Sequence, residues 1–429
     1  MNVASNRSGR GLTAMVFLFV VASVAFGQAT QLGGPTDTKK VLLFNMLQGT
    51  EAVNRKTVGA AAKYYAYRAT WPANVIEPEK VARDLDDVIT QIMNSKNFNK
   101  ARTREIDDFI KVFGEELVVA MKEVTDLPVI ENSRSQISAG QMFVPLARLQ
   151  TDAVDNYFSD LVKFQGNERK GHDVVRFWAL RGMREMFPVK AWGEPVGIFE
   201  LDKKSNIARK AADLARVKAL SEFILRPAPT TTTSEEQLAA FHYLRRDAIE
   251  TLSHAGYPAV NALKPGPAQK NAKVEGEIAL VLMKVLVPGA LNPDSTPLER
   301  AEAGIGLCQM KMVELYDPTP TYYFMGRSLI DLGRYAAENP KGTHGKVLSK
   351  RWELAIKELR AGATKESQAR ATEFERKSVS VLAAIATGGD PKHLNELEII
   401  VNKWAPPAAP IVLFDKRIES TPIVDWKGP

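Results

Sequence analysis

The stretch Ile106-Asp-Asp-Phe109-Ile110-Lys-Val-Phe113-Gly-Glu-Glu-Leu117-Val-Val-Ala-Met121 decides the fold of this chain. Its large apolar residues recur three or four positions apart, which is the spacing of one face of an α-helix. A helix with one apolar face must bury that face against another element. We therefore expect this stretch to be one member of a set of helices that pack on one another.

The same spacing recurs along most of the chain, and we find no convincing two-residue alternation of the kind that strands show. Two capping boxes mark helix starts, at Ser234 with Gln237 and at Thr296 with Glu299. Pro297 then stands at the first helical position, where proline is tolerated. The sequence predicts an all-α fold. Further one-sided helices are expected around residues 81–92, 154–162, 175–186, 278–286, 298–315, 352–359 and 374–385.

Length and composition predict two halves built from antiparallel helical hairpins. The 429 residues exceed what one compact core usually holds. The stiff polar segment Pro227–Ser234 is expected to link an N-terminal half, residues 30–226, to a C-terminal half, residues 235–405. Stacked hairpins of this kind would form either an irregular α-solenoid or two helical bundles.

The tail, residues 406–429, begins with two prolines and cannot continue a helix. It carries two apolar clusters, at residues 411–414 and 423–426. Apolar side chains of this size lose free energy when they are left in water. We therefore expect the tail to dock on its own helices or on a second copy of the chain.

The segment Asp173-Val-Val-Arg-Phe-Trp-Ala-Leu-Arg-Gly-Met183 resembles the second helix of a HEAT repeat. The Asp, Val, Arg and Ala-Leu residues stand where that family places them, and the resemblance is limited mainly to residues 171–187. No clean internal period of about 40–47 residues accompanies it. The resemblance implies stacked helical hairpins that bind through their surface, and it brings no catalytic residues with it.

Residues 1–29 have the features of a secretory signal peptide. Arg7 and Arg10 precede the uncharged apolar run 14–26, and Ala25 and Gly27 form a cleavable small-x-small site. The apolar run is shorter than the roughly 20 residues of a membrane span. We expect an exported protein, periplasmic or extracellular, with no transmembrane anchor after cleavage.

Charge and cysteine content narrow the classes of partner. The net charge is +7, of which Arg7 and Arg10 supply two while residues 1–29 hold no acid, so the mature chain carries +5. This weak excess is typical of a solubilising surface, and it does not indicate a nucleic-acid partner in an exported protein. Envelope polysaccharide or anionic lipid headgroups are the better candidates among charged partners. With one cysteine, the chain forms no internal disulfide and no cysteine-based metal cluster.

That cysteine, Cys308, lies on an apolar helix face with Ile305 and Met312, which predicts a buried, unreactive thiol. Gly304 and Gly306 lie in the same helical pattern. They lack the rest of a dinucleotide-binding motif, so we expect them to allow close packing of helices.

The insertion at residues 188–204 is the strongest candidate for a binding site, because long irregular loops in a compact fold are often functional. The candidate binding residues are Lys190, Trp192, Lys203 and Lys204. Trp192 between charged neighbours would serve as an exposed anchor. In the alternative, Trp192 and the apolar residues 198–199 fold back to cover a pair of helices.

Asp247, Glu250 and His254 are spaced so that they share one face of a helix. This face lies opposite the apolar stripe, so we expect three solvated side chains and no metal site. Arg245 instead falls within the stripe, where it is expected to extend its charge to solvent or to pair with a carboxylate at the junction between the halves.

The sequence assigns no catalytic residue, no metal ligand and no cofactor. It favours an exported, non-enzymatic helical scaffold that holds a protein or an envelope polymer by surface contact. The alternative is a helical hydrolase or lyase that acts on envelope polysaccharide with carboxylates brought together by folding. Two carboxylates about 5–9 Å apart in a deep cleft would favour the enzyme.

Overall fold

The computed structural model describes residues 45–48, 50–98, 103–126, 136–163, 172–187, 207–228, 234–255, 269–310, 318–363, 365, 367–405, 411–413 and 416–418. Its helices, with a 3-10 turn η2, are α2 (Arg55–Tyr67), η2 (Arg68–Thr70), α3 (Pro72–Ile76), α4 (Pro78–Phe98), α5 (Thr103–Thr125), α7 (Phe143–Ala147), α8 (Asp152–Lys163), α9 (His172–Met186), α10 (Ile207–Leu225), α11 (Glu235–Ala255), α12 (Gln269–Leu286), α13 (Pro297–Gln309), α14 (Pro318–Glu338), α15 (Thr343–Ala361), α16 (Gln368–Thr387) and α17 (Leu394–Asn402).

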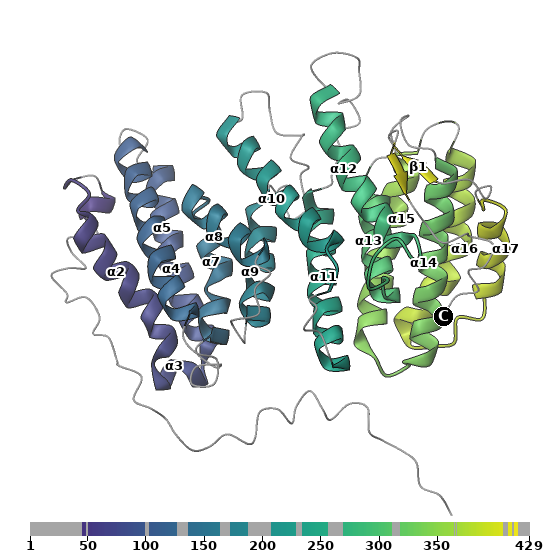
Figure 1. Cartoon of the computed structure of the whole chain (residues 1–429), viewed down its shortest axis with the longest axis horizontal. Coiled ribbons are helices and arrows are strands. Elements are labelled where there is room, and N and C mark those ends of the chain that lie inside the picture. Colours follow the sequence, from purple (N-terminus) through teal and green to yellow (C-terminus); the bar gives the residue numbers. More distant parts are fainter. Residues whose placement is uncertain are drawn as a thin grey trace, which may run out of the picture.

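The predicted all-α fold is confirmed (Figure 1). The described residues form strands only at β1 (Ile411–Leu413) and β2 (Lys416–Ile418), which pair antiparallel in the tail. The stretch 106–121 lies in α5, and its residues Ile106, Phe113 and Leu117 are buried in the core. One-sided apolar spacing therefore predicted the helix and also the face that it buries.

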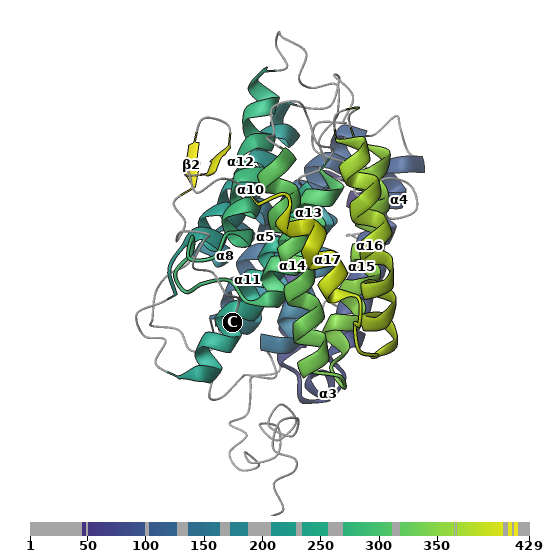
Figure 2. The same cartoon turned by 90° about the vertical axis from the view of Figure 1, so that its right-hand side faces the viewer.

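The helices stack in two rows that run the length of the molecule (Figure 1). In the first row α4, α7, α9, α11, α13 and α15 pack in this order, each against the next. In the second row the order is α5, α8, α10, α12, α14 and α17. Helix α2 covers α5 at one end, and α16 covers α15, α14 and α17 at the other, which Figure 2 shows from that end. Two rows of helices that pack side by side are the arrangement of an α-solenoid.

Helix α13 lies at the centre of the C-terminal part, in contact with α11, α12, α14 and α15, and residues 299–308 are all buried. The capping box at its start is confirmed, because the Thr296 side chain accepts from the Glu299 N–H and the Glu299 carboxylate accepts from the Thr296 N–H. The same reciprocal pair of bonds joins Ser234 and Gln237 at the start of α11.

The two glycines of α13 have the packing role that the sequence predicts. A Cβ on Gly304 would lie 2.4 Å from the Trp352 ring, and one on Gly306 would lie 2.2 Å from the Ser253 hydroxyl oxygen. Cys308 on the same helix is buried, and burial raises the pKa of its thiol well above the ordinary value. The thiol is thus protonated and shielded, as predicted.

The helices on either side of the segment 227–234 pack on one another. Helix α10 contacts both α11 and α12, and α9 contacts α11, so both rows continue past this segment. Most of the segment lies outside the described residues, as do the predicted signal peptide, residues 1–29, and much of the tail. Among the helices that are described, none is apolar enough over a sufficient length to cross a bilayer.

Candidate functional site

The predicted binding residues Lys190, Trp192, Lys203 and Lys204 all lie outside the described residues, with the rest of the insertion 188–204. The candidate site that the structure describes is elsewhere, on the first row. It is a network of charged side chains that joins α9, α11, α13 and α15. Sequence reasoning missed this network as a unit.

Four side chains, one from each helix, connect the network. Arg184 of α9 donates to Glu250 of α11, with 2.8 Å between Nη1 and Oε1. The same carboxylate oxygen lies 3.3 Å from Nη1 of Arg351 on α15. Arg351 reaches across α13 as well, where its Nη1 is 2.8 Å from Oε1 of Glu302. The arginine from α15 therefore ties together two helices, α11 and α13, that precede it in the row.

Asp247 and His254 extend the network along α11, and their placement corrects the prediction of a solvated face. Asp247 is buried and lies 3.9 Å from Nε of Arg181 on α9, while Glu250 and His254 are half-buried. The helical wheel gave the correct spacing, but α11 has α9 on one side and α13 on the other, so the face opposite its apolar stripe is covered too. No group of residues suited to hold a metal ion occurs in the described part of the chain.

Burial sets the protonation of the acids in this network. Burial, together with the neighbouring Glu250 charge, raises the pKa of Asp247 to about 6. Burial also raises the pKa of Glu302, although the Arg351 guanidinium favours its charged form. Oδ2 of Asp247 and Oε2 of Glu302 are buried and accept no hydrogen bond from any described residue. Two carboxyl groups in this part of the molecule can thus exchange protons near neutral pH.

His254 responds in the opposite direction. Its burial and the nearby Arg184 charge lower its pKa to about 4, so the imidazole is neutral at physiological pH. It adds no positive charge to the network. The positive charge comes from arginine alone.

Arg245 belongs to a second, fully buried ion pair. Its Nε lies 2.7 Å from Oε1 of Glu299, and both side chains have no exposed surface. Nη1 donates to the Pro293 carbonyl and Nη2 to the Asp294 carbonyl, while His242 Nδ1 lies 3.0 Å from the other Glu299 oxygen. The predicted pairing of Arg245 with a carboxylate is confirmed. Both partners lie within the predicted C-terminal half, so the pair holds α11 to α13 and does not mark the junction between the halves.

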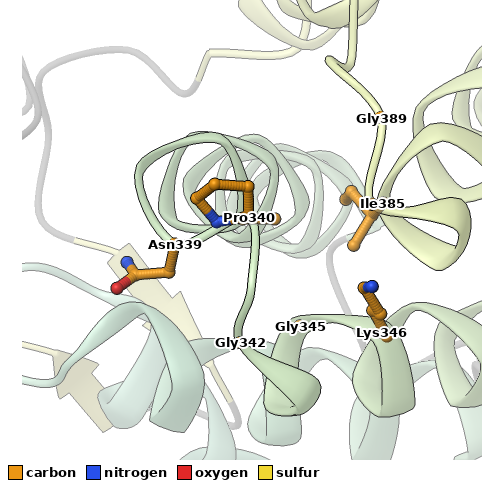
Figure 3. Close-up of a pocket in the computed structure, with 9 residues that line it drawn as sticks. Asn339, Pro340, Gly342, Gly345, Lys346, Ile385 and Gly389 are labelled. Carbon is orange, nitrogen blue, oxygen red and sulfur yellow. The ribbon is translucent and has the colours of Figure 1, made fainter. Parts of the chain in front are cut away.

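A small, open pocket lies away from the network, at the turn between α14 and α15 (Figure 3). Lys346 is the one charged side chain among the residues that line it, and it approaches Gly388, where α16 ends. The side chains of this lining include no carboxylate, thiol, hydroxyl or imidazole group. The residues that line it are Ala336, Asn339, Pro340, Gly342, Gly345, Lys346, Ile385, Gly388 and Gly389.

Comparison of the chain with protein-family models, with curated proteins and with solved structures finds no match.

Proposed function

We propose that this chain is a non-enzymatic binding scaffold that is exported to the periplasm or the cell exterior. It holds a protein or an envelope polymer by extended surface contact. The proposal of export depends on residues 1–29, and the HEAT-like segment at residues 171–187 agrees with a protein that binds through its surface.

The observation that supports the proposal best is the two-row stack of helices. Successive helices of one row lie side by side, so their outward residues make a long continuous surface. Stacks of this kind bind partners over many residues, with a few aromatic or arginine anchors supplying most of the affinity.

The charged network agrees with a structural role in such a scaffold. Each of its ion pairs joins two different helices of the first row, and Arg351 alone links α15 to both α11 and α13. Ion pairs of this kind fix how neighbouring helices sit, which keeps the shape of a long surface constant. Networks with perturbed acids also occur in purely structural settings.

The proposal is tested by capture of partners from envelope extract with the mature protein at low and at high salt. We expect a partner that survives high salt, because a contact anchored by an aromatic residue is screened little, and we expect Trp192→Ala to weaken it. Ile399→Ala, which shortens an exposed side chain on α17, is the control and should behave as wild type. If the Trp192→Ala variant retains the partner as well as wild type does, the insertion is not part of the binding surface.

The raised pKa values of Asp247 and Glu302 favour one second candidate, a hydrolase or lyase that acts on envelope polysaccharide. A carboxyl group that stays protonated near neutral pH is what a general acid requires. The purified protein would then release new reducing ends from the glycan, and Glu302→Gln would abolish the release. Absence of any release by the wild type would leave the scaffold as the better proposal.

A further inference from the structure

Two arginines of the first row have their guanidinium groups over aromatic rings and make no hydrogen bond with the described residues. Cζ of Arg181 on α9 is 4.4 Å from the ring centre of Phe177 and 5.6 Å from that of Trp178. Cζ of Arg246 on α11 is 4.8 Å from the ring centre of Tyr243. Together these five residues form what we call the arginine–aromatic strip.

The strip is continuous from one helix to the next. The rings of Phe177 and Tyr243 are 5.6 Å apart between their centres, and Trp178 lies 5.3 Å from Phe177. Tyr243 is exposed, Arg181 keeps 38% of its side-chain surface accessible, and the other three residues are half-buried. Contacts between rings and guanidinium groups therefore hold both arginines in place at the surface.

Neither arginine donates a hydrogen bond to a described residue, although the charge of Arg246 acts on Asp247 and Glu302. The ion pair of Arg181 with Asp247 is long, at 3.9 Å from Nε to Oδ2. Arg246 makes neither a hydrogen bond nor an ion pair with any described residue. This contrasts with Arg184 and Arg351, whose Nη1 atoms both lie within 3.3 Å of Glu250. Nε of Arg181 is buried, so the donors left for an external acceptor are the Nη groups of Arg181 and the guanidinium group of Arg246 on the adjacent helix.

A guanidinium edge matches a carboxylate, because it donates two parallel hydrogen bonds to the two oxygens. Packed helices lie about 8–10 Å apart, and same-face side chains of an extended peptide recur about every 7 Å. Two acidic side chains of one extended segment can therefore reach Arg181 and Arg246 together. One face of the Phe177 ring and one face of the Tyr243 ring already carry a guanidinium, which leaves less ring surface for stacking on a sugar ring.

We propose that the arginine–aromatic strip of α9 and α11 binds an extended acidic segment of a protein partner, with its carboxylates on Arg181 and Arg246. This inference depends on the proposed binding function, since it names the chemistry of the partner on one part of the scaffold surface.

The test is a titration of the full mature chain with a fluorescein-labelled octapeptide of alternating glycine and glutamate, followed by fluorescence anisotropy at about 0.15 M salt. Loss of each arginine as Arg181→Gln or Arg246→Gln should weaken binding about tenfold, because a charge-assisted bidentate contact is lost. The conservative variants Arg181→Lys and Arg246→Lys keep the charge but cannot donate two parallel hydrogen bonds to one carboxylate. They should therefore also bind the peptide more weakly than wild type. Lys350→Gln, the same loss of charge at an exposed position of α15, is the control and should bind as wild type.

Melting curves of all variants check that the fold is kept, which we expect because neither arginine is part of a hydrogen-bonded pair. Equal peptide affinity in wild type and in the double Arg181→Gln/Arg246→Gln variant would overturn the inference. Tighter binding of oligogalacturonate than of the peptide through the same two arginines would also overturn the inference, because the partner would then be an acidic polysaccharide. If a partner captured from envelope extract is lost from the Trp192→Ala variant and kept by the double variant, the scaffold proposal stands and this inference fails.

Discussion

Asp247→Asn should change how the stability of this protein depends on pH. Burial raises the pKa of Asp247 from 3.8 to about 6 in the folded chain. Between these values the folded state binds more protons than the unfolded state, so the free energy of unfolding of the wild type falls as the pH rises through this window. A pKa difference of about 2 corresponds to about 3 kcal/mol in all, of which about 1.5 kcal/mol is lost between pH 5 and pH 8.

The asparagine side chain carries no charge at any pH in this range. The difference in unfolding free energy, variant minus wild type, should therefore grow by about 1.5 kcal/mol in favour of the variant between pH 5 and pH 8. Urea unfolding followed by circular dichroism measures both curves. Asp160→Asn, the same change at an exposed position of α8, is the control and should show a constant difference. If Asp247→Asn gives a constant difference too, Asp247 is ionised and solvated, and the buried network is wrong.

Three further predictions concern the packing around α13. Arg245→Met leaves Glu299 buried without its guanidinium partner and should cost about 3–5 kcal/mol in the free energy of unfolding; a loss below about 1 kcal/mol would mean that the pair is not buried. Gly306→Ala places a methyl group against Ser253 and should destabilise by about 1–3 kcal/mol in spite of the better helix propensity of alanine, whereas a more stable variant would refute the close contact. The Cys308 thiol should react with a thiol reagent only after denaturation, and rapid modification of the native chain would show that α13 is accessible.

Local signals in the sequence were enough to predict the helices. The apolar spacing of α5 and the capping box at Thr296 each describe an environment within one helix or at its start. Such features depend on helical geometry alone, so they can be predicted without knowledge of the neighbours.

The regular stack was harder to recognise from the sequence because its repeat length varies. Four first-row helices begin at residues 172, 235, 297 and 343, so no single period relates them. The residues between α9 and α10, which include the predicted insertion 188–204, lengthen one repeat. The residues between α11 and α12 lengthen another.

The charged network could not be predicted because it depends on which helices are adjacent. Glu250 contacts one arginine from α9, which precedes it in the sequence, and one from α15, which follows it. Both arginines are distant from Glu250 along the chain. One signal was present, since Glu299, Arg300 and Glu302 interrupt the apolar pattern of α13. Charged residues inside an otherwise apolar helix indicate buried partners on neighbouring helices.

The central proposal, that the first row of helices binds a protein partner, is tested most directly by site-specific photo-crosslinking in envelope extract. A photoreactive phenylalanine analogue replaces Tyr243 on α11 of the first row or, as the control, exposed Val119 on α5 of the second row. A protein partner bound on the first row predicts a discrete covalent protein adduct from the Tyr243 position and none from Val119. Equal labelling from both positions, or no adduct at Tyr243, would contradict it.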